Sequence, residues 1–382
     1  MDRKISTALK MLALSIALVF IYKLGVEDKN DTVRNPSQTE YAYVNTSADG
    51  RESIIRDYRM GTSASVTVYG AGAESMAVLA FECIDRLDGR VLTLEIDRLA
   101  ADYKVGEPYK VSDELYNVLR QSLDICADSD GALDITIEPL NKLWGIEGKY
   151  DSFHVPDDDE ISAALDFVGY ENISVYKDNS IGSSKDSDSS NNDIYCSNEA
   201  GYILIDKENI DFAIGAVGKG YALDIIREEL EKSGAKGACV TIGGSILVYG
   251  SKTNGDGFNV GIRNPRGDEA DIIGQLTFET NETACISTSG DYEKYVEADG
   301  IRYHHIFDRS TGYPAKSGLI SVTVVCESGL CSDGLSTACF VLGYDKSLEL
   351  LEKYNADAVF VEDDGTVIIT DGLKGKFTPA ND

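Results

Sequence analysis

A carboxylate and a hydroxyl with helical spacing near the end of the chain could bind a metal ion. Asp333 and Thr337 lie four residues apart in the stretch 332–337, which is predicted to open a helix. Residues i and i+4 share one face of a helix, so the two side chains would point the same way. Hard oxygen donors suit Mg²⁺, which takes few protein ligands and completes its shell with phosphate oxygens and water. The alternative is that Asp333 only favours the helix dipole and Thr337 faces solvent or core.

A glycine-rich turn in mid-chain could bind phosphate. The stretch 215–221 contains three glycines and Lys219, and it leads into a predicted helix. Backbone N–H groups at a helix start, together with a lysine, can hold an anion. The Walker A spacing is absent, so the alternative of a turn with a surface lysine stays open. Gly243 and Gly244 likewise allow either the close approach of a ligand or a tight passage between strands.

Two adjacent histidines could supply a base. His304 and His305 lie in the strand-like stretch 303–308. Side chains alternate along a strand, so the two rings would point to opposite faces. One of them could accept a proton near neutral pH, and a hydrogen-bonded structural role is the alternative.

The elements that must position these groups follow one another without a regular strand–helix–strand rhythm. We therefore predict an α+β fold, a single large domain of mixed or antiparallel sheets with flanking helices. Ser112 is a predicted N-cap for a helix that runs to about Ala127. Other helices are predicted at 73–88, from the glycine-rich turn to 233, and at 346–354. Strands are predicted at 64–69, 202–205, 209–213, 237–242, 246–250, 258–263, 272–280, 319–325, 358–361 and 367–370.

The composition excludes one class of partner and sets a condition on others. The 382 residues are 43% hydrophobic, which fits a globular chain with a sizeable core. A formal net charge of -30 would repel phosphate backbones, so nucleic acid is not an expected partner. A phosphorylated ligand would have to be held through a cation, backbone N–H groups or a few placed lysines. The eight cysteines include no C-x-x-C pair, and Cys326 and Cys331 could either bridge or be buried free thiols.

The first residues predict a membrane segment. A basic start precedes the apolar run 11–22, which is typical of a signal anchor or signal peptide over residues 1–23. Residues 24–55 are polar and are predicted to form a linker. The body is predicted at 56–378, attached to the cell membrane and outside the cytoplasm. Within it, 178–198 is dominated by Ser, Asp, Asn and Gly, which predicts a disordered insertion.

Together, the motifs resemble the ApbE family of FAD:protein FMN transferases. The resemblance covers roughly residues 60–370 and is specific in the order and spacing of its motifs. The motifs are Met60-Gly61-Thr62; Asp130-Gly131-Ala132-Leu133-Asp134 with Pro139-Leu140 and Leu143-Trp144-Gly145; Val217-Gly218-Lys219-Gly220-Tyr221-Ala222 with Asp224; Ile242-Gly243-Gly244; Thr288-Ser289-Gly290-Asp291-Tyr292; His305-Ile306-Phe307-Asp308 with Thr311-Gly312-Tyr313-Pro314; and Asp333 with Thr337.

The resemblance implies an ApbE-like fold, an activity and its partners. Such enzymes take FAD and Mg²⁺, attach the FMN half to a threonine or serine hydroxyl of an acceptor flavoprotein, and release AMP. The implied acceptor belongs to an extracytoplasmic electron-transfer system. Two alternatives use the same features: a Mg²⁺-dependent FAD pyrophosphatase with water as nucleophile, and a non-catalytic flavin-binding module.

The resemblance also implies roles for individual residues. His305 is the candidate for the group that helps to deprotonate the acceptor hydroxyl. The implied Mg²⁺ ligands are Asp333, Thr337 and the carbonyl oxygen of Ala216. The implied FAD site is lined by Met60, Ala132, Leu133, Asp134, Lys219 and Phe307.

The chain departs from the family pattern at several positions. The aspartate expected six residues before Lys219 is Ala213 here, and Asp211 is the predicted substitute in the FAD site. Arg309 follows Asp308 where proline is usual. Ser336 occupies a position that is a third metal carboxylate in some relatives, so the implied metal site would rely more on water.

Overall fold

The computed structural model describes residues 41–146, 153–178, 200–268 and 270–380. They belong to one compact unit that begins at Tyr41. The signal segment predicted at 1–23 and nearly all of the insertion predicted at 178–198 lie outside the described residues. Within those residues, no helix has both the length and the apolar character that crossing a membrane requires.

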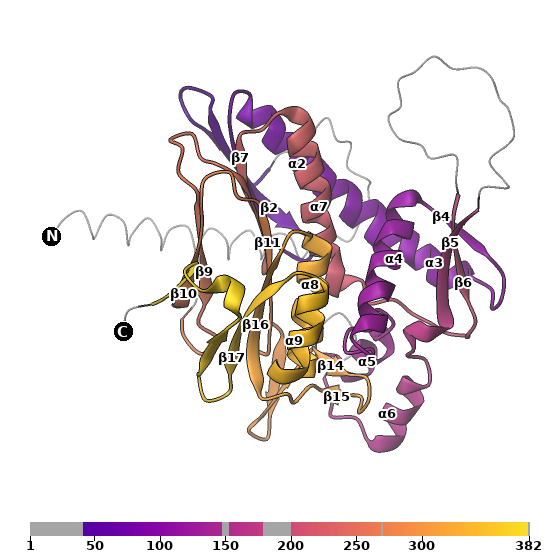
Figure 1. The fold of residues 1–382 in the computed structure, drawn as a ribbon. Coiled ribbons are helices and arrows are strands. Elements are labelled where there is room, and N and C mark those ends of the chain that lie inside the picture. Colours follow the sequence, from indigo (N-terminus) through magenta and orange to yellow (C-terminus); the bar gives the residue numbers. More distant parts are fainter. Residues whose placement is uncertain (1–40, 147–152, 179–199, 269, 381–382) are drawn as a thin grey trace, which may run out of the picture. The chain divides into compact units, whose positions relative to one another are not determined.

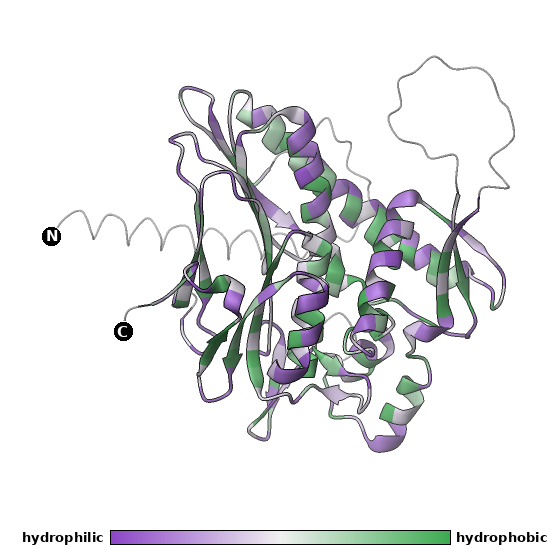
Figure 2. Cartoon of the chain, viewed as in Figure 1, coloured by the Kyte–Doolittle hydropathy of each residue, from purple (hydrophilic) through white to green (hydrophobic). Residues whose placement is uncertain are grey.

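A large antiparallel sheet organises the described part of the chain (Figure 1). Its nine described strands follow the order β1-β2-β3-β7-β8-β11-β16-β17-β18. Central strands such as β16 are buried on both faces, because both faces are covered. Figure 2 shows the resulting hydrophobic stretches in β16 and β17. The strands are β1 (Tyr43–Thr46), β2 (Glu52–Arg59), β3 (Thr62–Tyr69), β7 (Gly237–Ile242), β8 (Ser245–Gly250), β11 (Ala284–Gly290), β16 (Leu319–Cys326), β17 (Asp357–Glu362) and β18 (Val367–Ile369).

Helices cover one face of this sheet and a small sheet covers part of the other (Figure 1). The helical side holds α2 (Ala73–Arg86), α7 (Gly215–Ser233), α8 (Gly329–Leu342) and α9 (Tyr344–Lys353). Fully buried side chains such as Phe81 and Phe340 fill the layer between. The small sheet is β19-β10-β9, and its Phe258 and Leu276 pack on Val248 and Ile286 of the large sheet. Its strands are β9 (Phe258–Arg263), β10 (Ile272–Phe278) and β19 (Phe377–Pro379).

The remaining elements pack beyond the helical layer. Helix α4 (Asp113–Asp128) begins at the predicted N-cap, where the Ser112 hydroxyl accepts from Leu115 N–H at 3.1 Å. A π-helical segment (Leu87–Glu95) continues α2 into α3 (Ile96–Asp102). Short helices α5 (Glu138–Trp144) and α6 (Asp158–Leu165) enclose the buried Trp144. The other pieces are the sheet β4 (Tyr109–Val111), β6 (Ala200–Ile205), β5 (Ile173–Asp178) and the hairpins β12 (Tyr295–Ala298) with β13 (Ile301–His304) and β14 (Phe307–Asp308) with β15 (Tyr313–Pro314).

The α+β class and most predicted elements are confirmed, but the start of the body is not. Residues 43–46 and 52–59 are strands of the large sheet rather than linker. Ser53 and Ile55 are fully buried, while their neighbours Glu52 and Arg56 face solvent. The period-two burial was hard to recognise because most residues in this segment are polar. The body therefore begins near Tyr41, and only residues 24–40 of the predicted linker lie outside the described residues.

The strand predicted at 209–213 is wrong. Ile210 and Phe212 are buried as the alternation suggested, but their backbone pairs with no strand. The Ile210 N–H donates to the Tyr103 hydroxyl at 2.8 Å, and the Ala213 N–H donates to the Ile135 carbonyl at 2.7 Å. Irregular hydrogen bonds thus satisfy the backbone that a ladder would otherwise have satisfied.

Two further boundaries differ from the prediction. The stretch 303–308 is split between β13 and β14, with His305 and Ile306 between them. The helix that carries Asp333 begins at Gly329, four residues before it, because the Ser328 hydroxyl caps the Cys331 N–H. Cys326 and Cys331 are free thiols, so the possible bridge between them is not formed.

Candidate functional site

Two tight hairpin turns meet at one end of the large sheet. The β2–β3 turn is Met60-Gly61, with φ of 53° and 70°, and the β7–β8 turn contains Gly243 with φ 56°. The Gly243 N–H donates to the Ser63 carbonyl at 3.0 Å, which ties the second turn to β3. Such left-handed conformations favour glycine, and Met60 adopts one only because the hairpin requires it. The turns therefore lie together at one end of the large sheet, next to the last residues of β11.

Asp333 carries a buried carboxylate at this end of the large sheet. Its side chain is only 6% exposed. Oδ2 accepts from the Gly220 N–H at 2.9 Å, and Oδ1 accepts from the Ser245 hydroxyl at 3.2 Å. The Lys219 ammonium lies 3.4 Å from Oδ2. Desolvating a carboxylate is costly unless donors and a countercharge surround it, and α7 and β8 supply both.

Glycines let the two helices of the site approach each other closely. A Cβ at Gly220 of α7 would lie 2.0 Å from the Gly329 carbonyl oxygen and 2.7 Å from Asp333 Cβ. A Cβ at Gly329 of α8 would lie 2.2 Å from the Gly220 carbonyl oxygen. Only glycine fits at these crossings. The motif glycine at 220 is thus what allows the backbone of α7 to touch the carboxylate of α8.

Hydroxyl groups extend the site from α8 to β11. Thr337, one helical turn after Asp333, lies 3.1 Å from the Ser289 hydroxyl through its own Oγ1. Ser289 also lies 2.8 Å from Ser336, whose hydroxyl donates to the Asp333 carbonyl. Ser336, where the resemblance implies a metal carboxylate in some relatives, therefore binds protein groups. Asp333 and Thr337 lie one turn apart on α8, as their spacing predicted, with Asp333 bonded to α7 and β8 and Thr337 close to β11.

The start of α7 completes a set of oxygen donors. A helical carbonyl points at the N–H four residues further on, so the Ala216 carbonyl points toward the Gly220 N–H that donates to Asp333. Lys219 donates to the Gly215 carbonyl at 2.8 Å, which places an ammonium ion between this turn and Asp333. A cation thus already fits beside this carboxylate. Across the described residues, no three His, Cys, Asp or Glu side chains gather as a metal site, so a metal ion would rely on this mixed set.

Met60 lies over the same turn of α7. A Cβ at Gly218 would be 3.7 Å from Met60 Cε and 3.0 Å from Leu92 of the π-helical segment. The Met60 N–H donates to Asp88 Oδ2 at 2.8 Å, which holds the hairpin turn against that segment. The structure therefore brings Met60, Lys219 and Asp333 together around the first turns of α7.

The turn 129–134 packs against α8 through Leu133. Leu133 is buried in the core, and its Cδ2 would lie 3.2 Å from a Cβ at Gly334, with the partly buried Ala132 before it in the turn. Asp134 is buried and already paired: Oδ1 accepts from the Thr136 N–H and hydroxyl, and Oδ2 accepts from Arg309 at 2.7 Å. Arg309, at the position where the resemblance implies a proline, also pairs with Glu171.

Phe307 and Asp211 are committed to other contacts. Phe307 is buried, with its ring centroid 5.9 Å from that of Trp144. The Asp211 carboxylate pairs with Lys142 and accepts from the Phe212 N–H at 2.9 Å. The described contacts thus give both residues structural roles and leave their predicted contact with FAD untested.

The two histidines have different surroundings, although only His304 lies in a strand. His304 is buried, its Nε2 lies 3.1 Å from the Ala315 carbonyl, and its Nδ1 accepts from the Ile306 N–H at 3.3 Å. Burial lowers the pKa of His304 below its usual value. His305 is partly exposed, and its Nδ1 lies 3.2 Å from the Lys294 carbonyl. His305 is therefore the one of the two that can meet a substrate.

Sequence reasoning did not assign roles to two residues that hold the site. Ser245 donates to Asp333, and its place directly after the Gly243-Gly244 turn was the available signal. Asp224 accepts from Gly329 N–H at 2.7 Å and Leu330 N–H at 2.9 Å, and so caps α8 from α7. Burial raises the pKa of Asp224. The place of Asp224 in the motif that contains Lys219 was the sequence feature that could have identified it.

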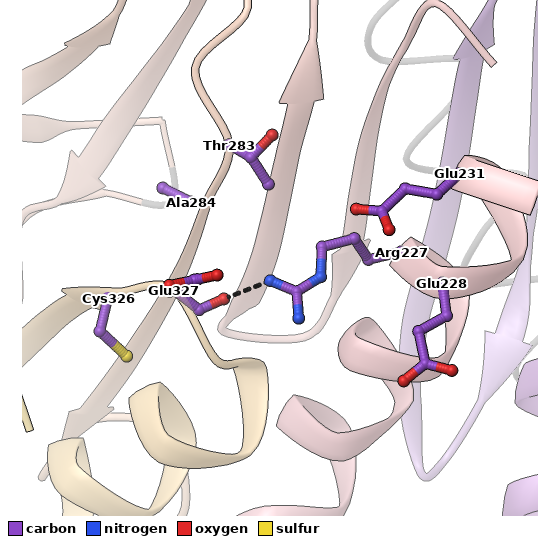
Figure 3. Close-up of a pocket in the computed structure, with 7 residues that line it drawn as sticks. All are labelled: Arg227, Glu228, Glu231, Thr283, Ala284, Cys326 and Glu327. Carbon is purple, nitrogen blue, oxygen red and sulfur yellow. Dashed lines mark hydrogen bonds between the residues drawn. The ribbon is translucent and has the colours of Figure 1, made fainter. Parts of the chain in front are cut away.

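A separate surface pocket of about 400 Å³ lies at the opposite end of β11 (Figure 3). Figure 3 shows Arg227 directed at the Glu327 carbonyl, to which it donates at 2.8 Å. Its lining includes none of the predicted site residues, so we do not assign the flavin site to it. The pocket is lined by Arg227, Glu228, Glu231, Thr283, Ala284, Cys326 and Glu327.

Comparisons with known proteins show the family of this chain. The sequence model of the ApbE family matches residues 60–360. An FAD:protein FMN transferase from Treponema pallidum (strain Nichols) is 30% identical over 350 residues, which cover 85% of this chain and 90% of that protein. The ApbE protein from Thermotoga maritima superposes with a TM-score of 0.71 at 30% identity, covering 85% of this chain and 99% of that one. The apo flavinyl transferase ApbE from Pseudomonas stutzeri gives 0.70 at 27% identity, covering 87% and 98%. The chain therefore belongs to the ApbE family.

Proposed function

We propose that this chain is an FAD:protein FMN transferase. It moves the FMN half of FAD to a threonine or serine hydroxyl of an acceptor flavoprotein and releases AMP. The observation that carries the proposal is the convergence of Asp333, the glycine-rich start of α7 and the hydroxyls of β8 and β11 at one end of the sheet. The family membership supports it, because matched relatives bear the name FAD:protein FMN transferase.

The reaction exchanges one P–O bond for another. The acceptor oxygen bonds to the phosphorus of the FMN half, the bridging oxygen leaves with AMP, and the hydroxyl proton passes to a base. We place His305 in that role. A carbonyl can only accept, so the contact with Lys294 assigns the proton of the neutral ring to Nδ1 and leaves Nε2 as the basic nitrogen.

Asp333, Thr337 and the Ala216 carbonyl would hold Mg²⁺, since hard oxygen donors are what this ion prefers. When bound, Mg²⁺ would neutralise pyrophosphate charge and act as a Lewis acid on the bond that breaks. Lys219 adds a positive charge at the same place, which a chain of net charge -30 needs in order to bind an anionic ligand.

The proposed walls of the FAD site come from three parts of the chain. We place Met60 and Leu133 in these walls, because Met60 lies over the first turns of α7 and Leu133 packs against α8 at Gly334, the residue after Asp333. The turn 129–134 would offer the partly buried Ala132, because the N–H groups of residues 129–133 and the Asp134 side chain are already bonded. We place the acceptor in an extracytoplasmic electron-transfer system, with the enzyme held at the cell membrane by residues 1–23.

One experiment tests the function. The protein is incubated with FAD, Mg²⁺ and a candidate acceptor domain, and the acceptor is weighed by mass spectrometry. A gain of one FMN is the expected result. Free FMN and AMP with an unmodified acceptor would identify the FAD pyrophosphatase instead, and intact FAD throughout would identify a non-catalytic flavin-binding module.

A further inference from the structure

The Lys219 ammonium pairs with the Asp333 carboxylate, which is also a proposed ligand of Mg²⁺. It lies 3.4 Å from Asp333 Oδ2 and 2.8 Å from the Gly215 carbonyl oxygen. These are a carboxylate and a first-turn carbonyl of α7, the same donor types that are proposed for Mg²⁺ one residue along. The other described partners of Asp333, the Gly220 N–H and the Ser245 hydroxyl, are neutral. Among the described contacts, Lys219 alone neutralises this buried charge.

A metal ion and the Lys219 ammonium cannot both lie beside the Asp333 carboxylate. Like charges a few ångströms apart in a site shielded from water repel strongly. The Lys219 side chain is 25% exposed, whereas Asp333 is 6% exposed, so the lysine is the partner that can move toward solvent. Its flexible four-carbon stem also lets the ammonium relocate without a change in the backbone.

We infer that Lys219 is a placeholder cation, which pairs with Asp333 until a divalent metal ion displaces it and is then free to bind the phosphates of FAD. The inference rests on the proposed function for the identity of the anion. Because binding couplings are reciprocal, Lys219 weakens metal binding in the absence of FAD, and metal binding in turn strengthens FAD binding. The metal and FAD would thus load cooperatively through one side chain.

Metal binding without FAD gives the first test, with Mn²⁺ as the probe and electron paramagnetic resonance of the free ion as the readout. Asp333→Ala defines the background, because a chain with 65 acidic residues binds Mn²⁺ weakly at its surface. In Lys219→Met we expect the Asp333-dependent site to bind Mn²⁺ at least about fivefold more tightly than in the wild type. The control is Lys232→Met on the same helix, an exposed lysine that pairs with Glu228, and it should change nothing.

FAD binding should move in the opposite direction. Lys219→Met should bind FAD more weakly than the wild type, and Mg²⁺ should improve its FAD affinity by a smaller factor. Equal or weaker Mn²⁺ binding in Lys219→Met overturns the inference, as does the absence of any Asp333-dependent Mn²⁺ site. If Lys219 served only to bind FAD, its removal would not increase the affinity of the site for Mn²⁺.

A measurement on the wild-type chain covers the case in which Lys219→Met does not fold. Acetic anhydride labels free amines, and mass spectrometry gives the labelling rate of each lysine. Adding Mg²⁺ without FAD should raise the rate at Lys219 and leave the rate at Lys232 unchanged, and a constant rate at Lys219 contradicts displacement. If these effects are observed but no FMN is transferred, the proposed function is wrong and the inference on Lys219 holds. If FMN is transferred but these effects are absent, only the inference on Lys219 is wrong.

Discussion

At the scale of single residues, the site depends on Asp333. Its carboxylate receives an N–H, a hydroxyl and an ammonium while remaining nearly inaccessible. In Asp333→Ala we expect the kcat of Mg²⁺-dependent transfer to fall at least about a hundredfold, the size seen when a strong electrostatic group is removed from an active site. The control is Asp124→Ala, an exposed carboxylate paired with Arg120 one helical turn away. Full activity in folded Asp333→Ala would place the metal site elsewhere.

His305 should act on the chemical step rather than on FAD binding. Because a general base contributes about 10²- to 10⁴-fold, His305→Ala should lower kcat within that range while the Kd for FAD changes little. Transfer kinetics and FAD titration measure the two effects separately. His154 is a suitable control, since it is a half-exposed histidine paired with Glu160. Equal losses in kcat and FAD affinity would mean that His305 only shapes the pocket.

His304 should make stability depend on pH. Burial lowers its pKa in the folded chain, so the unfolded chain binds the proton more readily below the usual pKa of about 6.5. The contribution to folding is therefore complete above that pH and is lost as the pH falls through it. Urea unfolding of the wild type and of His304→Gln between pH 8 and pH 5 should show a smaller loss in the variant. The same pH slope in both proteins would assign the effect to other groups.

Residue types predicted part of this site, and packing decided the rest. The i,i+4 spacing of Asp333 and Thr337 was enough to place both on one face of α8. The approach of Lys219 to Asp333 depends on how closely α7 crosses α8, which no local pattern encodes. Asp134 illustrates the same limit, because its pairing with Arg309 joins residues 175 positions apart in the sequence.

At the scale of elements, glycine sets the distance between α7 and α8. In Gly220→Ala, the new methyl group would meet the Gly329 carbonyl and the Asp333 side chain, so the helices must separate. We expect a loss of about 1–3 kcal/mol in unfolding free energy, as overpacked cores show, together with a loss of FMN transfer. Urea unfolding and the transfer assay measure both.

The same helix supplies the control for this substitution. A Cβ at Gly215 meets nothing within 4 Å, and alanine is the better helix former by about 1 kcal/mol. Gly215→Ala should therefore be neutral or slightly stabilising in urea unfolding. If Gly220→Ala behaves like Gly215→Ala, the close crossing is not required for the site.

Elements were predictable where the local signal was complete. The Ser112 cap and the strands 237–242 and 258–263 were read directly from residue type and alternation, and the structure has the same bounds for both strands. The segment 209–213 had the alternation of a strand without a partner strand. A ladder is a property of two segments, so a single segment cannot show whether the second one is present.

At the scale of the whole molecule, polar composition concealed where the body begins. The first two strands lie at one edge of the large sheet, with β1 as the outermost strand. An edge strand has one unpaired side and carries polar residues, which makes it resemble a linker in sequence. The buried positions 53 and 55 alternate with exposed ones, but two residues are too few to outweigh a polar segment.

The start of the body can be tested by comparing two shortened chains. One begins at Tyr41, whose ring lies 5.2 Å from that of Phe81, and keeps β1 and β2 whole. The other begins at Arg56, the boundary that composition suggested, and loses β1, half of β2 and the fully buried Ile55. Deleting a buried isoleucine alone costs about 2–5 kcal/mol, so the shorter chain should unfold at clearly lower urea concentration.

The same truncation should weaken FAD binding, because the β2–β3 pairing that begins at Glu52 and Tyr69 also fixes the Met60 turn. With half of β2 removed, the hairpin keeps only the pairs from Arg56↔Ser65 to Arg59↔Thr62, so it should hold Met60 over α7 less firmly. FAD titration of both chains measures this effect. Equal urea midpoints and equal FAD affinities would show that residues 41–55 extend the sheet without supporting the site. A loss of both stability and FAD affinity would show that the edge of the sheet holds the Met60 turn in place.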